Sequence, residues 1–197
     1  MKKLIIATQN KNKFQEIKAL LAPLNIQCLS LNDLNWKEEI IEDGFSFFEN
    51  ALKKAKTIAK FYNLPTLGDD SGLVVEALPN LLGVKSKRFS SEGTMKANNE
   101  KLLKHLKNIT NRKAYFISEI VLYYPNDKYY HYIGKVFGEI AYDYKGKNGF
   151  GYDPLFIVKD INKRMAELNE EEKNKISHRG KALKKLIEDI KNEVVII

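Results

Sequence analysis

The sequence predicts an α/β fold, in which a long mixed β-sheet is flanked by helices. Apolar runs typical of strands alternate with segments whose apolar residues recur at helical spacing. Two long β-rich runs, 114–124 and 128–137, surround Pro125-Asn126-Asp127 and indicate an antiparallel hairpin. The length of 197 residues suits one well-packed domain and is short for two. We therefore predict a single domain spanning residues 1–197.

The chain begins with a strand, a polar turn and a helix. Residues 3–7 form a short apolar strand, residues 8–13 are polar, and apolar residues then recur at helical spacing from Phe14 to Leu21. This order leaves backbone N–H groups at the helix start, where a phosphate binds well. Lys11 and Lys13 add positive charge, although the P-loop spacing is absent. The alternative is an ordinary turn with good capping residues.

The next segments predict a strand near residues 26–31, an acidic stretch over 32–44 and a second helix. Ser46 is the expected N-cap of that helix, and Glu49 completes a capping box. Lys53, Lys54 and Lys56 lie off its apolar stripe, where lysines are usually solvated.

Two adjacent aspartates distinguish the following segment. Residues 64–67 and 73–75 resemble two short strands, so Asp69-Asp70-Ser71-Gly72 is expected on the turn between them. Burying both carboxylates without a cation would cost several kcal/mol or leave one of them protonated. A divalent metal removes that conflict, and Mg²⁺ prefers few carboxylates together with phosphate oxygens. The alternative is a solvated turn, since Asp, Ser and Gly are common turn residues.

The remaining elements carry two more candidate clusters. Residues 80–93 are expected to be a loop, and Thr94 caps a helix that ends near Leu106. In 149–154, glycines flank Phe150, whose ring offers a flat face to a nucleobase. The alternative, which the residues alone favour, is a turn with two core aromatics. Ser177 then looks like the N-cap of a closing helix, which places His178 and Arg179 where the helix dipole disfavours cations. An arginine there suggests that an anion or a base joins it.

Composition argues against several classes of protein. The net charge of +8 comes from 33 lysines and arginines, but only four are arginines, and they are scattered along the chain. Nucleic-acid binders usually cluster such residues on one face, so we expect no nucleic-acid partner. The single cysteine, Cys28, fits a reducing compartment. No apolar segment approaches the length of a membrane span, and we expect a cytoplasmic protein without a membrane partner.

Five motifs occur in a characteristic order. They are Thr-x-Asn-x-x-Lys, Glu-Asp-Gly-x-x-Phe-x-Glu-Asn-Ala-x-x-Lys-Ala, Asp-Asp-Ser-Gly-Leu, Gly-Phe-Gly-Tyr-Asp-Pro and Ser-His-Arg-Gly-x-Ala-Leu. Together, from Leu4 to about Leu186, they resemble the inosine triphosphate pyrophosphatase family, which hydrolyses non-standard purine nucleoside triphosphates. Gln9 stands where many relatives carry glycine, and Gly68 stands where alanine is frequent.

The resemblance implies a fold of two lobes with the active-site cleft between them, a homodimer, and Mg²⁺ as cofactor. It implies that Asp70 is the catalytic base and that Glu42 and Asp70 bind the metal, with Asp69 and Glu39 as neighbouring or alternative carboxylates. It also implies that Lys13 and Lys54 are the main cations of the triphosphate site. The implied substrate-binding residues are Thr8, Gln9, Asn10, Lys11, Asn12, Lys13, Lys54, Ser71, Phe150, Gly151, Tyr152, Asp153, Lys173, His178 and Arg179.

The implied reaction is attack of water on the α-phosphorus of ITP, dITP or XTP, which gives the monophosphate and pyrophosphate. Such chemistry depends on alignment and charge neutralisation more than on a covalent intermediate. Two alternatives stay open. One is a pyrophosphatase that acts on other modified nucleotides, and the other is a basic nucleic-acid-binding module, which would bind in a steeply salt-dependent way without turnover.

Overall fold

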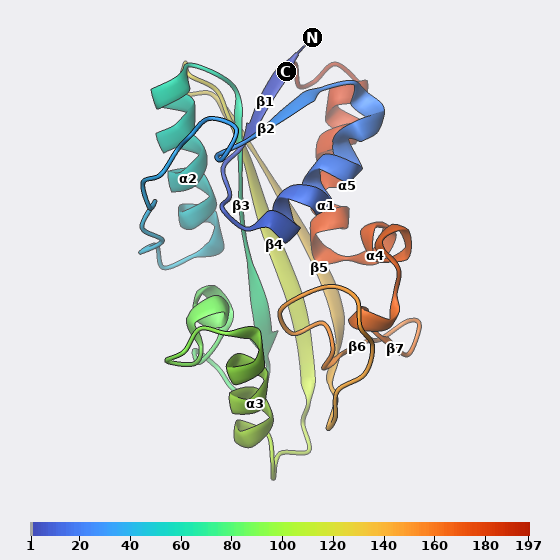
Figure 1. Ribbon diagram of the computed structural model, residues 1–197. Coiled ribbons are helices and arrows are strands. Elements are labelled where there is room, and N and C mark those ends of the chain that lie inside the picture. Colours follow the sequence, from blue (N-terminus) through green and yellow to red (C-terminus); the bar gives the residue numbers. More distant parts are fainter. Residues whose placement is uncertain (1) are drawn as a thin grey trace. The chain divides into compact units, whose positions relative to one another are not determined.

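The computed structural model describes residues 2–197, and its centre is a mixed seven-stranded sheet in the order β2-β1-β3-β4-β5-β6-β7 (Figure 1). The strands are β1 (Lys3–Ile6), β2 (Gln27–Ser30), β3 (Thr66–Val75), β4 (Lys113–Tyr123), β5 (Tyr129–Ile140), β6 (Phe156–Val158) and β7 (Lys163–Arg164). Strand β1 pairs in parallel with β2 and β3, whereas β6 pairs antiparallel with β5 and β7. The predicted mixed α/β fold is therefore confirmed.

Five α-helices and three 3₁₀ segments flank these strands within residues 2–197. The helices are α1 (Lys11–Leu21), α2 (Phe47–Tyr62), α3 (Met95–His105), α4 (Glu170–Ile176) and α5 (His178–Lys191). The 3₁₀ segments are η1 (Ala22–Leu24), η2 (Gly83–Arg88) and η3 (Met165–Glu167). The predicted capping box of Ser46 and Glu49 opens α2, and Thr94 caps α3, so both helix starts are confirmed. No helix among these residues is both long and apolar enough to cross a membrane.

The chain divides into two compact units. Unit 1 contains the described residues up to Asp70, with Ser118–Gly134 and Arg179–Ile197, and unit 2 contains Ser71–Ile117 and Lys135–His178. Strands β3, β4 and β5 contribute residues to both units. The predicted cleft between two lobes stays a prediction.

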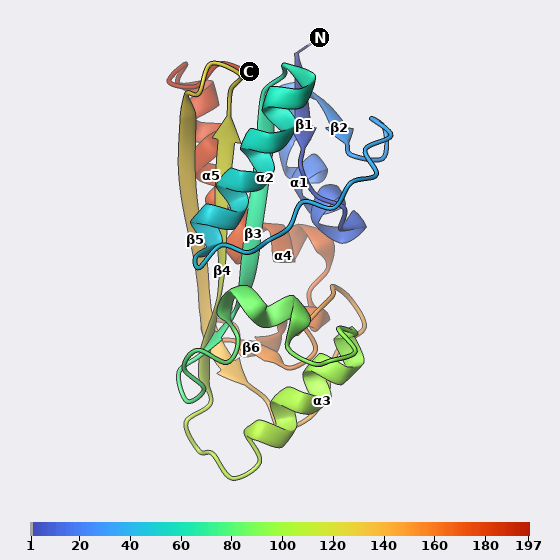
Figure 2. The ribbon, with the colours of Figure 1, turned by 90° about the vertical axis from the view of Figure 1, so that its left-hand side faces the viewer.

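Unit 1 is built by alternation along its strands. On β4, Ile120 and Leu122 pack in one apolar cluster with α1 and α5, whereas Val121 and Tyr123 pack in another with the alanines of α2. Successive side chains of a strand point to opposite faces, so these helices cover opposite faces of the sheet. Figures 1 and 2 show α1 and α5 on one side of these strands and α2 on the other.

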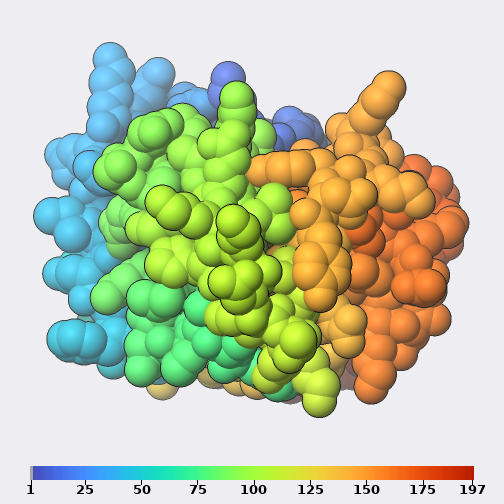
Figure 3. Space-filling model, turned by 90° about the horizontal axis from the view of Figure 1, so that it is seen from below, coloured from blue at the N-terminus to red at the C-terminus, as the bar shows by residue number. Residues whose placement is uncertain are grey.

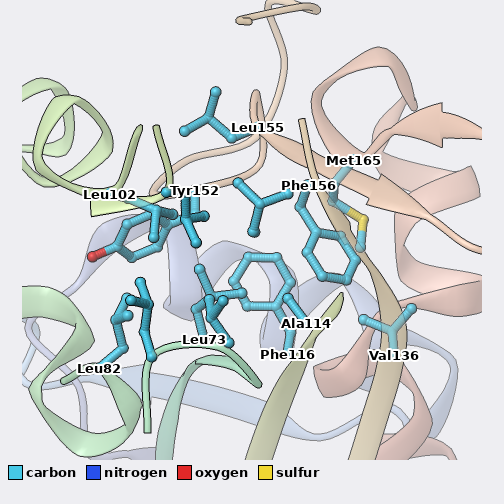
Figure 4. Close-up of a cluster of buried hydrophobic side chains, with 14 of the residues drawn as sticks. Leu73, Leu82, Leu102, Ala114, Phe116, Val136, Tyr152, Leu155, Phe156 and Met165 are labelled. Atoms are coloured by element: carbon cyan, nitrogen blue, oxygen red, sulfur yellow. The ribbon is translucent and has the colours of Figure 1, made fainter. Parts of the chain in front are cut away.

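Unit 2 has its own apolar core. The rings of Phe116 on β4 and Phe156 on β6 lie 4.6 Å apart, and Leu73, Leu102 and Tyr152 join the same cluster (Figure 4). Viewed from below, green residues of the segment that carries α3 lie on the surface next to orange residues of 135–160 (Figure 3). This core holds the loop of residues 149–153, because Tyr152 is one of its members.

One prediction of local structure is wrong, and one helix was not predicted. The Asp69-Asp70-Ser71-Gly72 segment is not a turn between two short strands but the middle of β3, one strand of ten residues. It can remain extended and buried because Asp69 and Asp70 find partners inside the protein, as described below. Helix α4 was not expected, although Asn169 and Glu172 form the capping box that opens it. Ser177 then stands between α4 and α5 in extended backbone, as an N-cap does.

Candidate active site

The turn between β1 and α1 is held by its own side chains. Asn10 is the N-cap of α1, and its Oδ1 accepts the backbone N–H groups of Asn12 at 3.0 Å and Lys13 at 3.2 Å. The Asn10 N–H donates to Thr8 Oγ1 at 3.2 Å. Two of the N–H groups expected to receive a phosphate therefore already have a partner, which agrees with the capping alternative. Gln9 is not part of this set, since its Nε2 donates to the Glu38 carbonyl at 3.3 Å.

Asp69 is the centre of a buried charge network in unit 1. Asp69 is 1% exposed, and its carboxylate lies 2.9 Å from Lys13 Nζ and 3.1 Å from Arg179 Nη2. Ser118 Oγ donates to its other oxygen at 2.6 Å. Arg179 in turn forms an ion pair with Glu16 of α1. Two carboxylates and two cations thus balance one another inside the protein, which reduces the cost of burying each.

Burial and charge act in opposite directions on Asp69. Burial alone would raise the pKa of this carboxyl, but Arg179 and Lys13 hold the pKa far below its usual range. For Lys13, burial is the largest effect and lowers the pKa of the ammonium, although Asp69 opposes it. Asp69 is therefore an ionised anchor for two cations. Among the predicted alternatives for a metal ligand, Asp69 is committed to these partners, and Glu39 is exposed.

Asp70, Glu42 and Lys54 form a second cluster in unit 1. Lys54, on the buried side of α2, forms an ion pair with Glu42, and its Nζ lies 3.8 Å from Asp70 Oδ1. The same Nζ donates to the Asp69 carbonyl at 2.7 Å. Burial, opposed by Lys54 and Lys13, raises the pKa of Asp70, and Glu42 adds to the rise. Lys54 therefore gathers two carboxylates from separate segments, and it is not the solvated lysine that its position off the apolar stripe suggested.

The carboxylates of Glu42 and Asp70 are suitable ligands for a hard divalent cation that also binds the phosphates of a nucleotide. Among residues 2–197, no group of three or more His, Cys, Asp and Glu side chains is arranged to hold a metal ion. Mg²⁺ does not require such a group, because it is usually held by one or two carboxylates together with phosphate oxygens and water. Glu42 and Asp70 supply that donor set, and the lysine between them is the kind of group that phosphates attract.

In unit 2, the loop of residues 149–153 positions Phe150. Asp153 Oδ2 accepts the Phe150 N–H at 2.8 Å and the Lys173 ammonium at 2.7 Å. Lys173 Nζ also lies 4.6 Å from the centroid of the Phe150 ring, a cation–π contact on one face. Gly149 has φ +75°, and a Cβ there would lie 2.1 Å from Asp153 Oδ2. The half-exposed Phe150 ring is thus held by residues that are themselves buried.

Two further contacts complete this loop. Asn99 of α3 donates to the Gly151 carbonyl at 2.9 Å, and Tyr152 Oη donates to the Ser86 carbonyl at 2.7 Å. His178, buried in unit 2, stacks on Phe116 with ring centroids 5.0 Å apart and an interplanar angle of 17°. Ser71, the first residue of unit 2, follows Asp70 directly on β3.

Each unit therefore gathers part of the predicted site. Unit 1 brings together Lys13, Lys54, Glu42, Asp70 and Arg179, and unit 2 brings together Phe150, Asp153 and Lys173. Sequence reasoning missed the partners that hold these groups, which are Glu16, Asn50, Ser118 and Asn99. Asn50 had one usable signal, because it lies four residues before Lys54 and so on the same face of α2.

The comparisons with known proteins point in one direction. The model of the Ham1 family matches residues 4–189. The dITP/XTP pyrophosphatase of Clostridium tetani is 44% identical, and the match covers 98% of each chain. The solved structure of the Coxiella burnetii HAM1 protein has a TM-score of 0.89 and 38% identity, covering 98% of this chain and 100% of that one. The Staphylococcus aureus Ham1 protein has a TM-score of 0.87 and 37% identity, with the same coverage.

Proposed function

This chain belongs to the Ham1 family, and from that premise we propose that it hydrolyses non-standard purine nucleoside triphosphates, namely ITP, dITP and XTP. The products are the nucleoside monophosphate and pyrophosphate, so the enzyme removes these triphosphates from the nucleotide pool. Curated relatives that share 44–47% of its residues over nearly the whole chain carry the name dITP/XTP pyrophosphatase. A hydrolase of nucleoside triphosphates needs cations for the phosphates, a base for water and a surface for the nucleobase.

The observation that carries the proposal is the cluster around Lys54. Two carboxylates, Glu42 and Asp70, share one buried ammonium, and Lys13 forms an ion pair with the adjacent Asp69. We assign Glu42 and Asp70 as the ligands of Mg²⁺. When bound, Mg²⁺ would neutralise charge on the phosphate oxygens and favour ionisation of water. Lys13 and Lys54 would exchange part of their contacts with carboxylates for contacts with the triphosphate.

Asp70 is the proposed base. The oxygen of a water molecule attacks the α-phosphorus, the bond from that phosphorus to the bridging oxygen breaks, and pyrophosphate leaves with the bonding electrons. The proton released by the water passes to the Asp70 carboxylate. Asp70 suits this task because it lies in the middle of strand β3 and is held from α2 by Asn50 and Lys54. The residues 8–13, with Ser71, would bind the rest of the triphosphate.

The nucleobase would stack on Phe150. Lys173 lies over that ring and helps to hold it in place for the base. We place Gly151, Tyr152 and Asp153 around it as the loop that fixes the ring, and His178 and Arg179 near the purine edge. Hypoxanthine and xanthine present an acceptor oxygen at C6, whereas adenine presents a donor amine. With adenine bound, protein donors at that edge would have no acceptor, so adenine nucleotides would bind more weakly.

Substrate class is tested by pyrophosphate release. ITP, XTP, ATP, dUTP and methylated pyrimidine triphosphates are compared at equal concentration with Mg²⁺ present. We expect ITP and XTP to be turned over far faster than ATP, and equal rates for ITP and ATP would contradict the proposal. A preference for the pyrimidine analogues would favour the alternative pyrophosphatase.

The assignment of Asp70 has its own test. The Asp70→Asn variant should fold and lose turnover, because the amide neither accepts the proton nor carries the charge that a cation needs. Isothermal titration of Mg²⁺ into the nucleotide-free protein should show weaker binding for Asp70→Asn and for Glu42→Gln. The exposed Asp143, which pairs with Arg164 in unit 2, provides the control substitution Asp143→Asn. Wild-type kcat in Asp70→Asn would remove Asp70 from its role.

Two further properties belong to the proposal. We propose a homodimer, supported by exposed aromatic side chains. One of them is Phe137, which is 56% exposed and whose ring centroid lies 5.6 Å from that of Tyr115. Light scattering across a concentration series would measure the mass of the particle. We also propose a cytoplasmic location, since a lone cysteine suits a reducing compartment; fractionation of cells that express the protein would check it.

A further inference from the structure

Asn50 is a buried polar residue that contacts the proposed base but takes no part in bond making or bond breaking. It lies in the second turn of α2, is 1% exposed, and uses both ends of its carboxamide. Its Oδ1 accepts the Gly44 N–H at 2.8 Å, and its Nδ2 donates to Asp70 Oδ2 at 3.0 Å. One side chain therefore joins the segment that contains Glu42 to the strand that carries Asp70.

The segment before α2 is shaped for this contact. A Cβ on Gly44 would lie 2.7 Å from Asn50 Oδ1 and 2.8 Å from the Cβ of Glu49. Only glycine therefore lets the backbone N–H at position 44 approach the amide this closely. Glu49 accepts the N–H groups of Phe45 at 2.6 Å and Ser46 at 3.2 Å, so three successive N–H groups of the segment are held by α2.

Asn50 and Lys54 act on the same carboxylate from one helix face. They are four residues apart on α2, and side chains at that spacing are neighbours. Asn50 binds Asp70 Oδ2, whereas Lys54 lies 3.8 Å from Asp70 Oδ1 and also pairs with Glu42. The helix thus distinguishes the two oxygens of Asp70, which fixes the rotation of the carboxylate about its last bond.

We propose that Asn50 is a positioning residue for the reaction. It holds Asp70 with one chosen oxygen toward Lys54 and Glu42, and it ties the Glu42 segment to the same helix. This inference rests on the proposed roles of Asp70 and Glu42, and it adds the group that sets their geometry. Partners of metal ligands usually matter in this way, because their loss costs about 10–100-fold in metal affinity or activity.

Two variants separate the two bonds. Asn50→Leu has nearly the same size and removes both bonds. Asn50→Asp retains an acceptor for the Gly44 N–H but replaces the donor that faces Asp70 with an oxygen. If orientation of Asp70 is the role of Asn50, both variants should lower kcat for ITP about 10–100-fold, with KM changed less than about threefold. A purely structural role would instead lower the amount of folded enzyme and leave kcat per folded molecule unchanged.

Ser46→Ala is the matched control, since it weakens the start of the same helix without touching Asp70. It should keep kcat within about twofold of wild type. Isothermal titration of Mg²⁺ into nucleotide-free Asn50→Leu should show about 10–100-fold weaker binding. Circular dichroism establishes that each variant is folded. If Asn50→Leu does not fold, the kcat of Asn50→Asp, which retains the bond to Gly44, tests the positioning role instead.

The outcomes distinguish this inference from its premise. If Asp70→Asn loses turnover while folded Asn50 variants keep wild-type kcat, the inference is overturned and the proposed function stands. If Asp70→Asn keeps wild-type kcat, the assignment of Asp70 fails, and the role of Asn50 is rejected with it. Loss of kcat in both Asn50 variants, but not in Ser46→Ala, supports the positioning role.

Discussion

Arg179 and Asp69, 110 positions apart in the sequence, form a buried ion pair in which Nη2 lies 3.1 Å from Oδ2. The Arg179 side chain is 1% exposed and forms a second ion pair with the carboxylate of Glu16. The conflict noted for a cation at the start of α5 is thus resolved by the protein's own anions. For this reason, a substrate that contacts Arg179 would meet a guanidinium whose position Asp69 and Glu16 already fix.

Asp69→Asn should destabilise the protein strongly. The variant leaves Lys13 and Arg179 buried with less compensating charge, and breaking a buried pair in this way costs about 3–5 kcal/mol. The free energy of unfolding, measured in urea, provides the check. Asp43→Asn is the control, because the Asp43–Lys53 pair is exposed and its loss should not be measurable. Equal effects of the two substitutions would contradict the role given to Asp69.

Phe150→Ala should weaken binding of ITP. Stacking of a base on an aromatic ring contributes about 1–3 kcal/mol, so a loss near the lower end raises KM roughly tenfold. The reacting groups lie elsewhere, and kcat should change only slightly. Steady-state kinetics with ITP measure both constants. Phe61→Ala, which removes an exposed ring on α2, should leave KM unchanged. An unchanged KM in Phe150→Ala would mean that Phe150 serves only to pack the loop.

Gly149→Ala should cost more stability than Gly83→Ala. Both glycines have positive φ, so each substitution carries the strain of about 1–2 kcal/mol that a left-handed residue imposes. Only at Gly149 would the new Cβ meet the Asp153 carboxylate, displacing it from Phe150 and Lys173. The difference in unfolding free energy between the variants should be at least about 1 kcal/mol. KM for ITP should rise in Gly149→Ala alone.

Alkaline pH should weaken the hydrogen bond that Tyr124 makes to the C-terminal segment. Tyr124 donates to the Ile196 carbonyl at 2.7 Å, and burial, with neighbouring Tyr130, raises the pKa of Tyr124 to about 12. An unfolded tyrosine titrates near about 10. Because the folded pKa is the higher one, this contribution to stability is complete below about pH 10 and is lost as pH rises from about 10 to 12.

Tyr124→Phe lacks that titration. Its unfolding free energy should be lower than that of wild type at neutral pH and should fall less steeply between about pH 10 and 12. Urea denaturation at several alkaline pH values measures both slopes. Identical slopes for the two proteins would show that Tyr124 does not couple folding to pH.

Much of the fold could be predicted because it depends on local patterns. Ser46, Glu49 and Thr94 mark helix starts through hydrogen bonds within a few residues of the chain. The segment around Asp69 could not be predicted in the same way. Its residues resemble a turn by composition, but they form a strand because Arg179, Lys13 and Ser118 reach Asp69 from distant parts of the sequence.

The candidate site shows the same division. The residue types of Asp70 and Phe150 indicated chemistry, whereas Lys54 was assigned a role only because its motif resembles that of a nucleotide-hydrolysing family. The residues that hold them could not be identified, since Asn50, Glu16 and Asn99 are ordinary helix residues until the fold sets each beside its partner. Helix α4 was missed for a different reason. Its capping signal at Asn169 was present, but seven residues are too few to show an apolar period.

The contact between Gly68 and Ala51 has a consequence for how this sequence can vary. A Cβ at position 68 would lie 2.1 Å from the Ala51 carbonyl oxygen, and this helix carries both Asn50 and Lys54. A larger residue at 68 would push α2 outward and draw both side chains away from Asp70. A substitution at Gly68 therefore requires a shift of α2, so position 68 and the packing of this helix cannot vary independently.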